Sequence, residues 1–169
     1  MKIGILSDTH LSAGGILPRQ VWESLADTEI ILHAGDILTE DLLRDLALIA
    51  PVYAVLGNCD RNIEGLPSKR VLCCGKFKIG LTHGHLGAGK DTPDRAYHLF
   101  DGDQVDIIVF GHSHIPYQEV RNGVILFNPG SPTQKRGQEY YSIGILTINE
   151  EAENKEKAIR MNHIFFGRG

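Results

Sequence analysis

Several short apolar runs in this chain each end in a loop that holds residue types known as metal ligands. The clearest run covers residues 107–110, with acidic residues before it and Gly111 after it. Such a run is typical of a buried strand that ends in a tight loop. His112 and His114 come next, and we expect Gly111 to turn the backbone sharply enough that both rings face the same small volume.

The first part of the chain alternates between expected strands and helices. Apolar runs predict strands at residues 2–6, 30–32 and 52–56. Between them, apolar residues recur at helical spacing after Pro18 and again from Thr39 onward. This order implies right-handed crossovers and a parallel sheet whose loops gather at one edge, where ligands bind in open α/β sheets. The loops that hold Asp8, Asp36 and Asn58 are therefore predicted to meet.

The rest of the chain is predicted to form hairpins around one more helix. Strands are expected at residues 70–74, 77–82, 107–110, 141–148 and 158–166, and a hairpin is expected over residues 119–127. Gly75-Lys76 fits a type II′ turn, and Asn122-Gly123 fits a type I′ turn. A helix is expected from Thr92 to about residue 100. The sequence shows no repeat or linker, so residues 1–169 are expected to form one domain.

Charge and cysteine content narrow the classes of partner. The net charge of -4 gives no reason to expect a nucleic-acid or membrane partner. No run approaches the roughly 20 apolar residues that a membrane span needs. The three cysteines are odd in number, and Cys73 and Cys74 are adjacent, which favours a reducing cytoplasm over a disulfide framework. Three of the eight histidines, His33, His98 and His163, lie in ordinary strand or helix contexts and are expected to be structural.

The loops after the strands hold two carboxylates, one amide and four imidazoles. These residues are Asp8, His10, Asp36, Asn58, His83, His112 and His114. Seven mixed oxygen and nitrogen ligands are too many for one transition metal, but they suit two metals about 3.5–4 Å apart that share a carboxylate. Two divalent cations would keep about two positive charges after the two aspartates are counted. The remaining positive charge would balance a bound hydroxide and an anionic substrate such as a phosphate ester.

Five short motifs follow the predicted strands: Asp8-Thr-His10, Gly35-Asp36, Gly57-Asn58, His83-Gly and Gly111-His-Ser-His114. Together and in this order they resemble the motifs of the calcineurin-like metallophosphoesterases. The short length, Gly-Asn-Cys-Asp at 57–60, Thr-His-Gly-His at 82–85 and Asn-Pro-Gly-Ser at 128–131 resemble the small YfcE-like phosphodiesterase branch. The resemblance implies an α/β fold, a four-layer α/β/β/α sandwich in which the hairpins of the second half supply the second sheet.

The same resemblance implies two divalent metal ions in each chain. The first would be bound by Asp8, His10 and His114. The second would be bound by Asn58, His83 and His112, and Asp36 would bridge both. Manganese is the expected metal, with nickel, iron and zinc left open because affinity follows availability as much as ligand type.

The resemblance further implies a phosphodiesterase that hydrolyses a small phosphate ester. A metal-bridged hydroxide would attack phosphorus, with His10, Asp36 and Asn58 as catalytic residues. A phosphomonoesterase or nucleotide phosphatase is an alternative within the same chemistry. An alternative of another class is a binding scaffold like the retromer subunit of this fold. A homodimer is also allowed.

The sequence departs from the fullest family pattern at Cys59, where many members have a histidine that protonates the leaving group. A thiol is a poor substitute for an imidazolium, and Asp60 would lose its role of orienting that histidine. Cys59 and His85 are the candidates for residues close to substrate. Two neighbouring loops, one with Asn128 and Ser131 and one with Arg136, could either contact substrate or only shape the surface.

Overall fold

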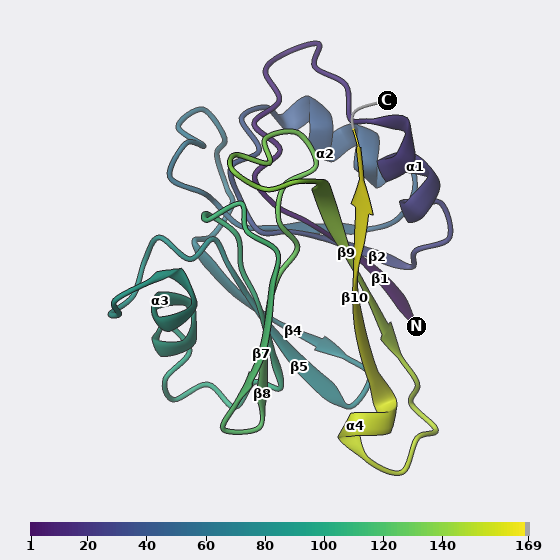
Figure 1. The fold of residues 1–169 in the computed structure, drawn as a ribbon, viewed down its shortest axis with the longest axis vertical. Coiled ribbons are helices and arrows are strands. Elements are labelled where there is room, and N and C mark those ends of the chain that lie inside the picture. The colour runs from purple at the N-terminus through teal and green to yellow at the C-terminus, as the bar shows by residue number, and fades with distance from the viewer. Residues whose placement is uncertain (168–169) are drawn as a thin grey trace.

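The computed structural model describes residues 1–167, and the last two residues of the expected domain lie outside that range. Within this range the strands form two five-stranded sheets that pack face to face (Figure 1). The strand order is β10-β9-β1-β2-β3 in the first sheet and β4-β5-β6-β8-β7 in the second. Helices cover the outer faces, so the predicted four-layer α/β/β/α arrangement is confirmed.

The first sheet contains the three predicted parallel strands, β1 (Lys2–Leu6), β2 (Ile30–His33) and β3 (Val52–Ala54). Helices α1 (Arg19–Leu25) and α2 (Glu40–Ala47) connect them and pack on the outer face. Because β1 to β3 run in the same direction, the loops after them meet at one edge of the sheet.

The last hairpin, β9 (Tyr141–Ile148) and β10 (Ile159–Phe166), joins the first sheet, with β9 antiparallel to β1. The expectation that both late hairpins build the second sheet is therefore wrong for this one. Strand β9 is buried along seven of its eight residues, so it needs neighbours on both edges and a covering layer on both faces. The free edge of β1 satisfies this need. The short helix α4 (Lys155–Ala158), which was not expected, precedes β10.

The second sheet is centred on β6 (Ile107–Val109), the strand that ends before His112. It lies parallel to β5 (Phe77–Thr82) and to β8 (Val124–Asn128), while β4 (Lys69–Cys74) and β7 (Tyr117–Arg121) form the antiparallel edges. Helix α3 (Thr92–His98) packs on the outer face. The turns match the prediction, with positive φ at Gly75 and at both Asn122 and Gly123.

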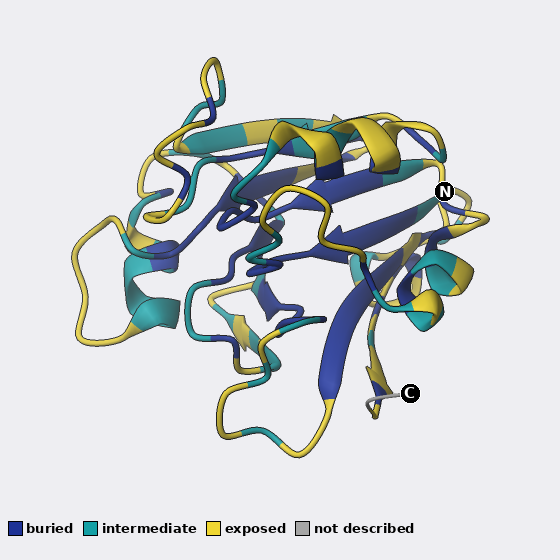
Figure 2. Ribbon diagram, turned by 90° about the horizontal axis from the view of Figure 1, so that it is seen from above, coloured by how far each residue is buried: buried dark blue, intermediate teal, exposed yellow. Residues whose placement is uncertain are grey.

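Successive side chains of β6 point to opposite faces of the second sheet, into two different apolar clusters. Ile107 and Val109 point into the apolar cluster between the two sheets, and Ile108 belongs to the cluster under α3. Figure 2 shows the same division, with buried strands inside and helices exposed on their outer faces. In residues 1–167, no helix is long and apolar enough to cross a bilayer.

Candidate metal centre

All seven predicted ligands come to one place, where the carboxyl edges of the two sheets meet. The first sheet supplies four of them after β1, β2 and β3: Asp8, His10, Asp36 and Asn58. The second sheet supplies three after β5 and β6: His83, His112 and His114. The site therefore lies between two sheets rather than at the edge of one.

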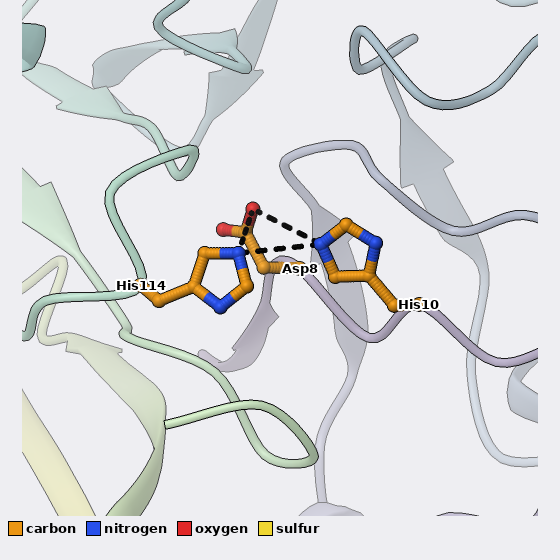
Figure 3. A group of neighbouring side chains, drawn as sticks. All are labelled: Asp8, His10 and His114. Atoms are coloured by element: carbon orange, nitrogen blue, oxygen red, sulfur yellow. Dashed lines mark hydrogen bonds and ion pairs between the residues drawn. The ribbon is translucent and has the colours of Figure 1, made fainter. Parts of the chain in front are cut away.

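The first donor group contains Asp8, His10 and His114, whose ligand atoms all lie within 4.8 Å of one another (Figure 3). The two Nε2 atoms are 3.2 Å apart. Asp8 Oδ1 lies 3.3 Å from His114 Nε2 and 3.9 Å from His10 Nε2. The three side chains therefore point their electron-rich atoms at a common point.

A second donor group contains Asp8, Asp36 and His83 at the same close spacing. His83 Nε2 lies 3.1 Å from Asn58 Oδ1 and 3.4 Å from Asp36 Oδ2. His10 Nε2 is also 3.4 Å from that oxygen, so Asp36 Oδ2 is equally close to an imidazole of each predicted metal position. His112 lies further out, with its ring 5.1 Å from the His83 ring, and in residues 1–167 it joins none of the close groups.

Two of the imidazoles are oriented by backbone carbonyls. Nδ1–H of His83 donates to Ala34 O at 2.7 Å, and Nδ1–H of His114 donates to Gln134 O at 2.5 Å. A carbonyl only accepts, so each Nδ1 must carry the proton, and in the neutral ring Nε2 presents its lone pair to the centre. This arrangement is typical of histidines that bind metals.

Five of the seven predicted ligands have a left-handed backbone: Asp8, His10, Asp36, His112 and His114. Such conformations are uncommon for residues other than glycine and concentrate at functional sites. Gly111 does not have this conformation, so the expectation that it makes the sharp turn is wrong. A Cβ on Gly111 would lie 1.7 Å from Ser7 Oγ and 2.6 Å from Asp8 Oδ2, so glycine is needed for close approach instead.

Asp60 has a role that the sequence did not reveal. Its two carboxylate oxygens accept four backbone N–H groups, from Gly57, Asp36, Ile37 and Leu38, at 2.7–2.8 Å. The side chain therefore fixes the Asp36 loop against the Asn58 loop. Asp60 keeps a structural function even though the histidine that it would orient is absent.

Asn128 and Ser131 shape the neighbouring loops, and both are buried. Ser131 Oγ donates to Asp8 O at 2.7 Å, and Asn128 Nδ2 donates to Gly111 O at 2.7 Å. Among the histidines expected to be structural, His33 is fully buried, accepts N–H from Gly35, and lies 3.1 Å from Thr9 Oγ1. Burial lowers the pKa of His33 to about 4, which keeps the ring neutral at pH 7.

The two candidates for substrate contact both border the centre. Cys59 is exposed, and its Sγ forms a third close group with His10 and Asp36. The His85 ring lies 5.3 Å from that of His83 and 6.2 Å from that of His112. Its buried Nδ1 has no hydrogen-bond partner within residues 1–167.

The electrostatics of the centre favour a bound cation. Burial raises the pKa of Asp8 to about 6, and Asp8 Oδ1 is buried without a hydrogen-bond partner in the described part of the chain. Burial alone would raise the pKa of Asp36, but His83 and the Cys59 N–H lower it well below its usual range. Burial alone would lower the pKa of His83, but Asp36 and Asp8 outweigh burial and raise it. The raised pKa means that the buried Asp8 carboxyl holds its proton more tightly. A bound cation would take the place of that proton and give Asp8 Oδ1 a partner, so the residues present fit a metal.

Comparison with known proteins defines the class. Residues 1–151 match the model of the calcineurin-like phosphoesterase superfamily domain. A probable metallophosphoesterase of Methanothermobacter thermautotrophicus is 36% identical over 159 residues, which cover 92% of this chain and 91% of that protein. The phosphodiesterase YfcE of Escherichia coli is 35% identical over 103 residues, which cover 56% of this chain and 52% of that protein.

Solved structures show a similar fold. Vacuolar Protein Sorting 29 from Cryptosporidium parvum matches with a TM-score of 0.79 and 23% identity over 99% of this chain and 98% of its own. A novel archaeal phosphodiesterase matches with a TM-score of 0.74 and 25% identity over 98% of this chain and all of its own. The chain belongs to the calcineurin-like phosphoesterase superfamily, a family of metal-dependent hydrolases of phosphate esters, and YfcE is among its relatives.

Asp60→Asn should destabilise the metal-free protein strongly. The amide replaces one of two acceptor oxygens, so two backbone N–H groups lose their partner at a cost of about 1–3 kcal/mol each. Urea unfolding measures the change. Asp101→Asn is the control, because Asp101 is exposed and, within residues 1–167, its side chain hydrogen-bonds to His98 alone, so we expect a change within about 0.5 kcal/mol. Equal unfolding midpoints for the two variants would contradict the structural role of Asp60.

Asp8→Asn should stabilise the metal-free protein at neutral pH. The pKa of Asp8 is about 6 in the folded state and 3.8 ordinarily, so wild-type stability is lost as pH rises between these values. The loss at pH 7 amounts to at most about 3 kcal/mol, and an uncharged amide avoids it. Thermal unfolding in chelator at pH 7.5 and at pH 4 should show a gain at the higher pH alone. With saturating metal the order should reverse, because the variant lacks a ligand. A gain of equal size at both pH values would show that charge burial is not its cause.

Proposed function

We propose that this protein is a metal-dependent phosphodiesterase with two divalent ions in each chain. The observation that carries the proposal is the position of Asp36 Oδ2, at 3.4 Å from both His10 Nε2 and His83 Nε2. A carboxylate shared by two donor groups is the arrangement that a pair of metal ions uses.

The chain offers each ion its own donors around that shared oxygen. One ion would be bound by Asp8, His10 and His114, and the other by Asn58, His83 and His112. When bound, two such ions lower the pKa of a shared water and withdraw negative charge from a phosphate group. Backbone carbonyls orient the rings of His83 and His114, and Asp60 fixes the loops that hold Asp36 and Asn58. The donors are therefore in place before any ion binds, which lowers the cost of ordering the site.

Manganese is the metal that we propose first, with nickel, iron and zinc as alternatives. Carboxylate and amide oxygens suit manganese, while four imidazoles also suit the later metals of the series. The three cysteines of the chain are unpaired, which supports a reducing cytoplasm as the compartment.

A small phosphodiester is the proposed substrate. The names of two relatives, YfcE and the archaeal protein, support a diester over a monoester or nucleotide. Arg136 offers a positive charge beside the centre, since it adds to the effect of burial in lowering the pKa of His114. A binding scaffold is the weaker candidate, because every ligand position holds a competent donor and the likeness to Vacuolar Protein Sorting 29 concerns the fold alone.

Asp36→Ala should lower the metal content at both positions, from two ions toward none, because it removes the shared ligand. Elemental analysis of dialysed protein measures this content, and Asp101→Asn should keep two ions. Hydrolysis of a panel of monoesters and diesters by metal-loaded wild-type protein tests the substrate class. One ion in the wild type, or two in Asp36→Ala, would contradict the dinuclear centre. Faster hydrolysis of monoesters would overturn the diester assignment.

The leaving group should matter strongly, because Cys59 stands where a proton donor is expected. Burial and the charge of Asp36 raise the pKa of the thiol, which makes it a still weaker acid in the metal-free protein. General acid catalysis typically contributes about 10²–10⁴-fold, so rates for aryl phosphodiesters should fall steeply as the pKa of the leaving phenol rises.

Cys59→His should flatten this dependence by supplying an imidazolium. Steady-state rates for four or five aryl diesters, measured on both proteins at equal metal content, give the two slopes. A shallow slope in the wild type would show that another residue already protonates the leaving group, and His85 is then the first to replace, since its unpartnered Nδ1 borders the centre.

A further inference from the structure

Cys59 lies beside two of the predicted ligands, although neither metal position inferred from the sequence includes it. Its Sγ, a ring nitrogen of His10 and a carboxylate oxygen of Asp36 all lie within 4.8 Å of one another. Thiolate, imidazole and carboxylate are the three side-chain types that bind zinc and related ions. The sulfur therefore has the chemistry and the position of a ligand.

The position of the sulfur is fixed by its surroundings. The Cys59 N–H donates to Asp36 Oδ1 at 2.8 Å, and Asn58 Nδ2 donates to Sγ at 3.3 Å. Asp60, the next residue, is tied to four backbone N–H groups. Gly57 packs so tightly on Asp36 that an added Cβ would lie 2.1 Å from Oδ1. The loop thus holds the thiol beside Asp36 through contacts on both sides of it.

An independent observation points to a cation beside His10, the residue that the Cys59 group shares with the Asp8 group. Asp8 Oδ1 is fully buried, has no hydrogen-bond partner within the described residues, and lies 3.9 Å from His10 Nε2. An ionised carboxylate oxygen without a donor is costly to bury. A cation near His10 would relieve that cost whether or not a cysteine were close.

We infer that the Cys59 thiolate is an additional ligand of the ion bound by His10 and Asp36. The inference rests on the metal centre of the proposed function. On binding, the S–H bond breaks, the proton leaves to solvent, and a sulfur electron pair forms the bond to the metal. No electron is transferred to or from the protein. Without an ion, the negative charge of Asp36 favours the protonated thiol. A bound divalent ion brings positive charge to the same place, and a thiol that coordinates such an ion is deprotonated.

The soft sulfur changes which ions the centre prefers. Thiolate selects zinc, cobalt and cadmium over manganese, whereas the other seven donors discriminate less. Loss of the sulfur should therefore weaken cadmium binding much more than manganese binding. An outer-shell partner alone is worth about 10–100-fold in metal affinity, so Cys59→Ser should weaken cadmium binding by at least about tenfold.

Cobalt titration of the metal-free, fully reduced protein without oxygen tests the inference directly. The visible d–d bands report that cobalt is bound, and the near-ultraviolet thiolate-to-cobalt band reports a metal–sulfur bond. We expect both signals in the wild type, and only the d–d bands in Cys59→Ser. Cys73→Ser is the matched control, because Cys73 is an exposed cysteine on β4, outside the ligand groups, and both signals should remain.

The outcomes separate this inference from the proposed function. Visible d–d bands without the charge-transfer band in the wild type would overturn the role of Cys59 and leave the metal centre intact. A charge-transfer band that survives in Cys59→Ser would overturn it as well. Failure of cobalt, manganese and cadmium to bind at all would overturn the metal centre and this inference together.

Discussion

Two buried carboxylates, Asp8 and Asp36, control the arrangement of the region where the sheets meet. Ionised carboxylates lose far more hydration energy on burial than one apolar contact returns, so each oxygen needs a donor or a cation. Asp36 Oδ1 receives the Cys59 N–H, and Asp8 Oδ2 receives the Ser7 hydroxyl and the His112 N–H. Asp8 Oδ1 receives nothing from residues 1–167, and the neighbouring imidazoles turn their nitrogen atoms toward it.

The loops around these carboxylates are held from outside. Ser131 binds the backbone of Asp8, Asn128 binds that of Gly111, and Asp60 binds those of Gly57 and three residues of the Asp36 loop. These contacts explain how several predicted ligands keep a left-handed backbone, since each such conformation costs energy that the surrounding structure must offset. The donors are therefore largely positioned before an ion binds.

Much of this arrangement could be predicted because residue types and strand order are visible in the sequence. Parallel strands bring their following loops together, so the convergence of Asp8, Asp36 and Asn58 needed only the strand order. The role of Asp60 could not be predicted, because its partners are backbone N–H groups, which every residue except proline has. The pairing of β9 with β1 was missed for a similar reason, since an apolar strand fits any free edge. Gly111 was expected to allow a sharp turn, but glycine is needed there because the backbone lies close to Ser7. That contact is a tertiary one, so the sequence could not reveal it.

The two sheets share the ligands almost equally, and this division affects how the chain can assemble. Asp8 and His114 are separated by 105 residues of sequence, yet their ligand atoms lie 3.3 Å apart. Such long-range contacts form late and slowly, because the entropy of closing the chain must be lost first. An ion with the full set of ligands can therefore bind only after both sheets have docked. A bound metal would then further stabilise an interface that the apolar residues between the sheets have already formed.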